Sequence, residues 1–190
     1  MRDADEDIWI REARQGSIDA FNCLVERFQT LAYGVAFRYL GNANDAADVT
    51  QDAFFSAYRA LTTFRGGSFS AWLLRIVVNA CHDAHRRSSR RPTSSMDIIV
   101  EELGEAPWED EQAPDPESEA LSIEAREEIE RALARLPDEQ RLAIVLVDVE
   151  GLSYEEAAAA AGCAVCTIRS RLARGRSRVR DELLAAGMLS

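Results

Sequence analysis

Residues 150–180 read EGLSYEEAAAAAGCAVCTIRSRLARGRSRVR, and this stretch predicts two helices joined by a tight turn. Ser153 and Glu156, three residues apart, form the capping box that begins many helices. An alanine-rich helix then runs to Gly162, the residue type favoured where a helix ends in a left-handed turn. A second helix follows Ala164. We therefore predict a helix-turn-helix.

The second helix of this motif has one apolar face and one basic face. Its apolar residues recur at helical spacing: Val165, Ile168, Leu172, Val179 and Leu183. Between Cys163 and Arg180 there are six arginines and no acidic residue. A short capped helix, a tight turn and a basic amphipathic helix are the parts of a protein that reads the DNA major groove. A solvated amphipathic helix, the alternative, explains the arginines but not the absence of acids.

Length and composition are typical of a globular protein. The chain has 190 residues, 47% of them hydrophobic, which is enough for one large or two small domains. No apolar run approaches the roughly 20 residues that a membrane span needs. The acidic start lacks the basic region of a signal peptide, and four cysteines are too few for a disulfide scaffold. We expect a cytoplasmic protein without direct membrane insertion.

The net charge of −11 is distributed unevenly along the chain. Residues 1–91 have 12 arginines and 11 acidic residues, whereas residues 121–190 have 10 arginines and 12 acidic residues. Residues 92–120 have 10 acidic residues and no arginine, show no helical periodicity, and contain Pro107, Pro114 and Pro116, which we expect outside any helix. We predict a flexible acidic linker at 92–120 between domains at 1–91 and 121–190.

Helical periodicity extends over both predicted domains. Apolar residues follow a 3.6-residue period in segments at 5–15, 18–40, 42–61, 70–91, 121–136 and 138–150. Asp138 is expected to cap the last of these. No segment has the alternation of a strand, so the predicted fold is all-α: two small helical domains, the second ending in the helix-turn-helix.

Two surfaces of the first domain are candidate binding sites. On the helix at 42–61, Asp45, Asp48 and Asp52 share one face and repel one another. This face is either simply exposed or a docking surface for a basic partner, and the residues alone favour neither. On the next helix, a polar ridge suited to phosphate and base contacts is predicted. It consists of Arg75, Asn79, His82 and Arg86. Trp72 of the same helix is expected in the core.

The order of these parts resembles an extracytoplasmic-function sigma factor of the sigma-70 family. Four segments carry the resemblance: GSIDAFNCLVERF (16–28), DAADVTQDAFFSAYRAL (45–61), FRGGSFSAWLLRIVVNACHD (64–83) and LPDEQRLAIVLVDVEGLSYEEAAAAAGCAVCTIRSRLARGRSRVR (136–180). The resemblance implies a protein that binds core RNA polymerase and directs promoter-specific transcription initiation. It also implies an anti-sigma factor as a partner, although no residue identifies one.

The resemblance also implies residue roles. Docking on the clamp helices of the polymerase falls to Asp45, Asp48, Gln51, Asp52 and Phe55. Reading of the minus-ten element, where a base is flipped into a pocket, falls to Phe64, Arg65, Ser68, Phe69, Arg75, Asn79, His82 and Arg86. Reading of the minus-thirty-five element falls to Thr167, Arg169, Ser170, Arg171 and Arg174. Arg176 and Arg178 are expected on phosphates or on the polymerase flap.

The chain departs from the family pattern at the recognition helix. The family often has a proline and a glycine where this chain has Ala164 and Cys166. Gly175 interrupts the helix at a cost of about 1 kcal/mol relative to alanine. We infer how the helix approaches DNA from the residues that match the family pattern.

Other functions are less favoured by the residues. Cys163 and Cys166 form a C-x-x-C without a second pair, and the Cys81, His82 and His85 group lacks a fourth ligand, so no metal site is predicted. No phosphate-binding glycine loop, nucleophile elbow or acid–base pair is recognisable, so neither catalysis nor a cofactor is expected. The alternative function is a free-standing dimeric helix-turn-helix repressor that binds a palindrome.

Overall fold

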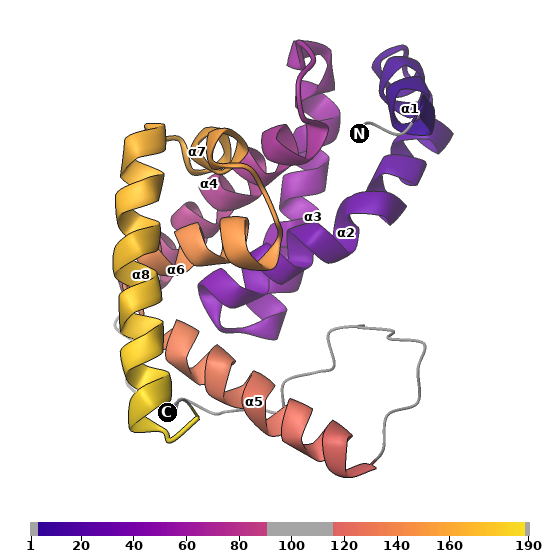
Figure 1. Ribbon diagram of the computed structural model, residues 1–190. Coiled ribbons are helices and arrows are strands. Elements are labelled where there is room, and N and C mark those ends of the chain that lie inside the picture. Colours follow the sequence, from indigo (N-terminus) through magenta and orange to yellow (C-terminus); the bar gives the residue numbers. More distant parts are fainter. Residues whose placement is uncertain (1–3, 91–115, 189–190) are drawn as a thin grey trace.

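The computed structural model describes residues 4–90 and 116–188, and within these ranges every regular element is a helix (Figure 1). The predicted all-α fold class is confirmed. Residues 91–115, most of the predicted linker, lie outside the described residues. We call residues 4–90 the first half and residues 116–188 the second half.

Four helices and one short turn build the first half. They are α1 (Ala4–Arg14), α2 (Ile18–Leu40), α3 (Ala43–Ala60), the 3₁₀ turn η1 (Leu61–Thr63) and α4 (Phe69–Arg90). The Ser17 hydroxyl accepts a hydrogen bond from the Ala20 amide at 3.2 Å and caps α2. Gly41 ends α2 at φ +69°, a backbone conformation that glycine adopts without strain. Asn42 then caps α3.

The core of the first half lies where α2, α3 and α4 pack together. Leu24 of α2, Ala53 of α3 and Leu73 of α4 are completely buried. Burial of a leucine side chain contributes about 1.5–3 kcal/mol, so these contacts fix the three helices against one another. The packing also decides which face of α3 and which face of α4 remain outside.

The second half is organised around the crossing of α6 and α8. Its elements are α5 (Pro116–Ala134), α6 (Asp138–Ile144), the π-helical turn η2 (Val145–Val149), α7 (Tyr154–Ala161) and α8 (Val165–Ala185). The predicted capping box at Ser153 and Glu156 is present, and Gly162 ends α7 at φ +64°. The predicted helix-turn-helix is therefore formed by α7 and α8.

Gly175 is buried at the helix crossing. A Cβ added to it would lie 2.8 Å from Cδ1 of Ile144 and 3.3 Å from the carbonyl oxygen of Gln140. Glycine is thus the residue that lets α8 approach α6 closely. This packing accounts for the helix-weakening residue that the sequence places in the recognition helix.

Two expectations from the sequence are wrong in this half. Helix α5 begins at Pro116, within the predicted linker, because proline is favoured at the first helical position, where its missing N–H would have no partner. Asp138 does not cap α6, since Pro137 holds the cap position and no side chain bonds there. The Asp138 carboxylate instead lies 3.6 Å from Nε2 of His85.

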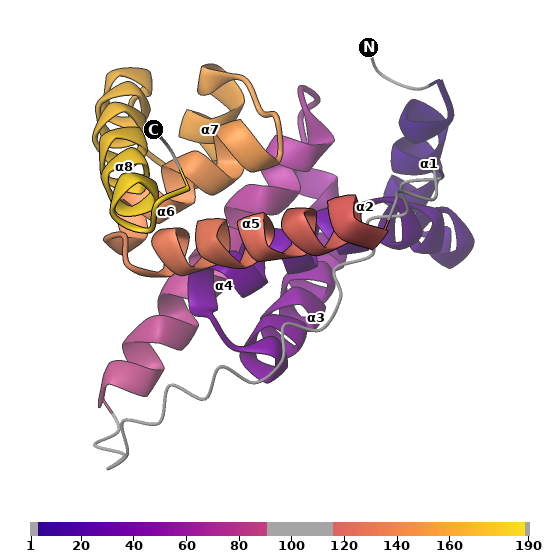
Figure 2. The same cartoon turned by 60° about the horizontal axis from the view of Figure 1, so that its bottom comes forward.

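The two halves pack directly on each other (Figures 1 and 2), with α7 against α4 and α6 against α2. Arg38 of α2 reaches two carboxylates of the second half, Glu130 at 3.1 Å and Glu150 at 3.5 Å. Arg141 of α6 donates to the carbonyl oxygen of Tyr39 at 2.9 Å. These polar contacts join residues about a hundred positions apart in the chain.

Candidate nucleic-acid and protein interfaces

The outward face of α3 carries all five residues assigned to polymerase docking. Asp45, Asp48, Gln51, Asp52 and Phe55 are exposed. The opposite face of the helix is buried against α2 and α4. Phe55 has 59% of its surface exposed, although a phenylalanine contributes more stability when it is buried. Phe55 and the carboxylates around it are therefore available for contact with another protein.

The loop before α4 turns at Gly66 and Gly67, which have φ of +91° and +92°. The predicted minus-ten residues in and beside this loop differ in burial: two are aromatic and buried, and two are polar and at least partly accessible. Phe64 and Phe69 are only 4% and 1% exposed and pack on each other with ring centroids 5.6 Å apart. They belong to the core, so the expectation that they touch DNA does not hold in this conformation.

Arg65 and Ser68 of the same loop remain accessible in different degrees. Arg65 is exposed, and Ser68 is partly buried and accepts a hydrogen bond from the Ala71 amide at 3.2 Å. Trp72, expected in the core, is only half-buried and packs against the core, with its ring 5.4 Å from that of Phe64. The aromatic residues hold the loop against α4. The polar residues of the loop remain available for contacts with DNA.

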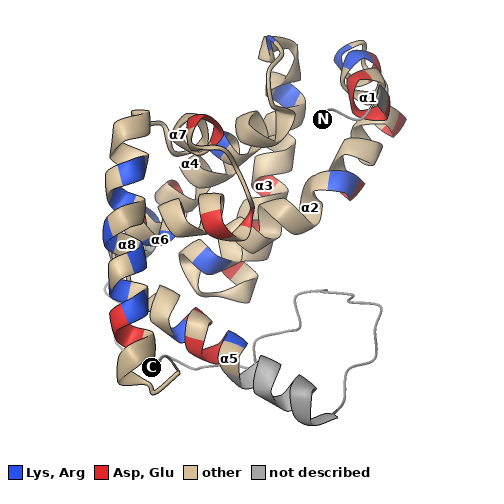
Figure 3. Ribbon diagram, viewed as in Figure 1, with Lys and Arg blue, Asp and Glu red and all other residues tan. Residues whose placement is uncertain are grey.

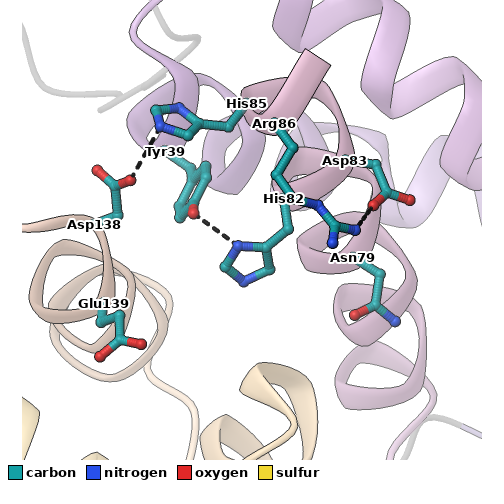
Figure 4. A pocket seen from close by; sticks show the side chains of 8 residues that line it. All are labelled: Tyr39, Asn79, His82, Asp83, His85, Arg86, Asp138 and Glu139. Carbon is teal, nitrogen blue, oxygen red and sulfur yellow. Dashed lines mark hydrogen bonds and ion pairs between the residues drawn. The ribbon is translucent and has the colours of Figure 1, made fainter. Parts of the chain in front are cut away.

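The polar ridge of α4 forms one wall of a groove of about 700 Å³ between the two halves (Figure 4). The groove is lined by Tyr39, Asn79, His82, Asp83, His85, Arg86, Asp138 and Glu139. Three of the four predicted ridge residues line it, and the fourth, Arg75, is exposed elsewhere on α4. Asp138 and Glu139, from the first turn of α6, form the facing wall and place negative charge opposite the ridge.

His82 is held in place by the end of α2. Its Nδ1 lies 2.9 Å from the hydroxyl of Tyr39. Burial, followed by the negative charge of Asp138, raises the pKa of Tyr39 to about 12, so the hydroxyl stays protonated at neutral pH and can donate to His82. Arg86 forms an ion pair with Asp83 of its own helix. Asn79 is exposed at the mouth of this arrangement.

Helix α7 covers the loop side of the same region. Its Glu156 interacts with Ser68 as well as with Ser153. Although partial burial opposes ionisation, the hydrogen bonds from Ser153 and then from Ser68 hold the pKa of Glu156 below its usual value. The second half therefore overlies the predicted minus-ten site in this conformation.

Arginines recur along much of the length of α8 (Figure 3). Arg169 lies over the ring of Tyr154, with Cζ 5.4 Å from the centroid. Arg176 makes two hydrogen bonds to the carboxylate of Asp148, at 3.0 and 2.5 Å. These two guanidinium groups are thus held by neighbours from α7 and η2.

The remaining polar residues of the predicted minus-thirty-five set differ in exposure. Arg171 has only 19% of its side chain exposed and pairs with Glu139 at 2.7 Å. Arg174 is exposed and donates to the carbonyl oxygen of Ser170 one turn earlier. Ser170 and Arg178 are exposed, and Thr167 is half-buried. Reading the sequence as one basic face missed this division between free and paired arginines.

Three residues that contact these arginines were not predicted from the sequence, Glu139, Asp148 and Tyr154, and neither was Asp138 on the wall of the groove. Asp138 and Glu139 have the pattern of an acidic first turn, which is common in helices for reasons unrelated to a site. Asp148 lies within an apolar segment and Tyr154 at the start of a helix, and only the fold brings them to α8. No sequence signal separates these four residues from ordinary surface positions.

The structure gives no support for a metal site among the residues that it describes. Within residues 4–90 and 116–188, no three histidine, cysteine or acidic side chains are grouped to hold an ion. Cys163 is half-buried, Cys166 is exposed, and both are free thiols. None of the described helices is long and apolar enough to cross a membrane.

A two-part helical protein with an exposed acidic helix and a C-terminal helix-turn-helix belongs to the class of DNA-binding transcription proteins. Residues 24–91 match the family model of sigma-70 region 2, and residues 126–179 match that of sigma-70 region 4. Together with the relatives described next, these matches show that the chain belongs to the sigma-70 family, as an extracytoplasmic-function (ECF) RNA polymerase sigma factor. This confirms the resemblance drawn from the sequence.

Individual relatives support the same assignment. The chain is 39% identical over 180 residues to the ECF RNA polymerase sigma-E factor of Escherichia coli K12, covering 94% of each chain. It is 37% identical over 169 residues to the ECF sigma factor SigE of Mycolicibacterium smegmatis, covering 89% of this chain and 63% of that protein.

Two solved structures share the fold. One is CnrH in complex with the cytosolic domain of CnrY, with a TM-score of 0.67, 31% identity, and coverage of 96% of this chain and 99% of that one. The other is the sigma factor RpoE of Bartonella quintana in complex with the anti-sigma factor NepR. It has a TM-score of 0.68, 28% identity, and coverage of 87% of this chain and 98% of that one.

Proposed function

We propose that this sigma factor docks on core RNA polymerase through the exposed face of α3, reads the minus-ten element with α4 and reads the minus-thirty-five element with α8. The observation that carries the proposal is the α3 face, where Phe55 is 59% exposed among carboxylates. The sigma factor acts as a non-catalytic subunit, since the chemistry of RNA synthesis belongs to the polymerase.

The division of labour follows the two halves of the chain. Residues 1–91 dock on the clamp helices and contact the minus-ten element, and residues 121–190 contact the minus-thirty-five element and the flap. The acidic part of the predicted linker that precedes α5, residues 92–115, passes through the polymerase cleft, where its negative charge suits a path otherwise taken by nucleic acid. Because polymerase and promoters lie in the cytoplasm, the protein works there.

Promoter reading requires a change in the arrangement of the halves. A base flipped towards Asn79 has to enter a region that α6 and α7 overlie in the described conformation. Flipping costs a few kcal/mol of unstacking, which contacts in an open pocket must offset. We infer that the second half moves off α4 when the polymerase is bound.

An anti-sigma factor is a further proposed partner. Two similar proteins have been solved with protein partners, CnrH with the cytosolic domain of CnrY and the sigma factor RpoE with the anti-sigma factor NepR. The similarity covers most of this chain in both cases. An anti-sigma factor that holds the halves together would keep the protein from promoters until it is released.

The docking role of α3 is tested by charge reversal. We expect the double change Asp48→Arg, Asp52→Arg to lower the affinity for core polymerase at least about tenfold, because each like charge across an interface opposes association. The measurement is the Kd for purified core polymerase. Glu26→Arg, an exposed acid on α2, is the matched control and should leave it unchanged. An unaltered Kd for the double variant would mean that this face of α3 is exposed to solvent and does not bind the polymerase.

A further inference from the structure

Arg169 and Arg176 lie seven residues apart on α8 and therefore share one face of the helix. The residues that contact them lie outside the predicted DNA-reading set, and one of them, Tyr154, also packs against the apolar core. Tyr154 places its ring beneath Arg169 at 5.4 Å, and Asp148 makes a two-bond ion pair with Arg176. The Tyr154 hydroxyl also lies close to Arg176.

The positions of these two residues follow from the backbone around them. Tyr154 is the first residue of α7, directly after the Ser153 cap, so the capping box fixes its direction. Asp148 lies on η2, where the Glu150 amide bonds back to the carbonyl oxygen of Val145 at 2.9 Å. This five-residue step is a π turn, a rare element that is frequent at functional sites.

The contacts restrict side chains that are otherwise mobile. An arginine has four side-chain torsions and loses considerable freedom when it binds a base or a phosphate. Stacking on an aromatic face and pairing with a carboxylate fix the plane of the guanidinium before DNA arrives. The Asp148 hydrogen bonds, and to a smaller degree Tyr154, also raise the pKa of Arg176.

Resting on the proposed role of α8, we propose that Tyr154 and Asp148 are positioning residues for promoter recognition. Tyr154 orients Arg169 towards the DNA, and Asp148 orients Arg176. The negative charge of Asp148 has a second effect, because it repels DNA phosphates. This repulsion weakens binding to DNA of the wrong sequence more than it weakens binding to the promoter, where Arg176 is engaged. Neither residue needs to touch the DNA for these effects.

The test uses the complete sigma factor in holoenzyme with a promoter fragment recovered by run-off transcription. Two Kd values of the holoenzyme are measured: one for this fragment and one for the same fragment with a scrambled minus-thirty-five element. We expect Tyr154→Leu to weaken specific binding about two- to fivefold, the size of an exposed cation–π contact. Tyr154→Phe keeps the stack on Arg169 and should remain near wild type.

Double variants separate positioning from packing. In an Arg169→Ala background, Tyr154→Leu should cause no further loss of specific binding, because the side chain that it positions is absent. An equal loss in both backgrounds, or no loss in the wild-type background, overturns the role of Tyr154. If Arg169→Ala itself leaves specific binding unchanged, the proposed reading by α8 fails, and the positioning inference fails with it.

Asp148 is tested by the ratio of specific to scrambled affinity. Asp148→Asn removes the negative charge and the strong pair with Arg176, so we expect tighter binding to scrambled DNA and a ratio lowered at least about twofold. Asp181→Asn, an exposed acid later on the same α8 helix, is the matched control and should leave the ratio unchanged. An unchanged ratio for Asp148→Asn overturns its role.

Discussion

At the scale of the residue, Gly175 determines how closely α8 can cross α6. Helix propensity alone predicts that alanine here would stabilise the protein by up to about 1 kcal/mol. The neighbouring Ile144 and the backbone of Gln140 leave no room for the added methyl group. Overpacking of this kind costs about 1–3 kcal/mol, so packing outweighs propensity.

We therefore expect Gly175→Ala to lower the free energy of unfolding by about 1 kcal/mol, measured by urea denaturation. Ser177→Ala, an exposed change two residues later on the same helix, removes no packing and should stabilise slightly. A Gly175→Ala variant that is more stable than the wild type would show that α8 does not cross α6 this closely.

At the scale of the element, α4 and α8 carry the proposed DNA contacts on faces that their own burial patterns define. In α4, Leu73, Val77 and Cys81 are buried, which leaves Asn79 on the outside. Burial raises the pKa of the Cys81 thiol to about 12, so the thiol stays protonated at neutral pH and packs as a small apolar group. The polar ridge of α4 is therefore formed by the polar residues of the helix and not by Cys81.

For α4 we expect Asn79→Ala to reduce run-off transcription from a cognate promoter at least about tenfold, since a flipped base would lose its hydrogen-bond partner. The affinity for core polymerase should not change, because α3 is untouched. Asn22→Ala, an exposed asparagine on α2, serves as the control. Normal transcription by the Asn79→Ala variant would remove Asn79 from the site.

The helices and their faces could be predicted from the sequence because apolar spacing determines which side of a helix is buried. The capping box at Ser153 and the turn at Gly162 were predictable for the same local reason. The burial of Phe64 and the π turn at η2 were not, since both depend on contacts that form only in the folded chain. The pair between Arg141 and the Tyr39 carbonyl joins residues 102 positions apart, and no local pattern encodes it.

At the scale of the whole molecule, Arg38 is the main polar link between the halves. Its side chain is 10% exposed, and it compensates Glu130 and Glu150, which are 29% and 15% exposed. Gly34, one turn earlier on α2, leaves the space that this pair occupies. Removing one partner of a buried ion pair is costly because the remaining charge stays desolvated.

We expect Arg38→Gln to open the arrangement of the halves, with a larger radius of gyration in small-angle scattering and unchanged helical content by circular dichroism. Arg135→Gln, which affects an exposed pair with Glu182, should leave the radius unchanged. If Arg38→Gln remains as compact as the wild type, the polar contacts of Arg38 do not hold the halves together.

Substitution of Glu150 should affect the packing of the two halves differently from substitution of Arg38. Burial raises the pKa of Glu150, although Arg38 acts in the opposite direction. A raised pKa means that protonation favours the packed state, and this contribution is complete below the ordinary glutamate pKa and is lost as pH rises through the raised value. Glu150→Gln should therefore keep the halves packed at neutral pH.

The most direct measurement is run-off transcription with purified core RNA polymerase on genomic promoter fragments, with and without this protein. Discrete start sites that appear only in its presence are the predicted result, and they would reveal both promoter elements. No stimulation of transcription, together with tight binding of the protein alone to a duplex palindrome, would contradict the sigma-factor account and favour a dimeric repressor.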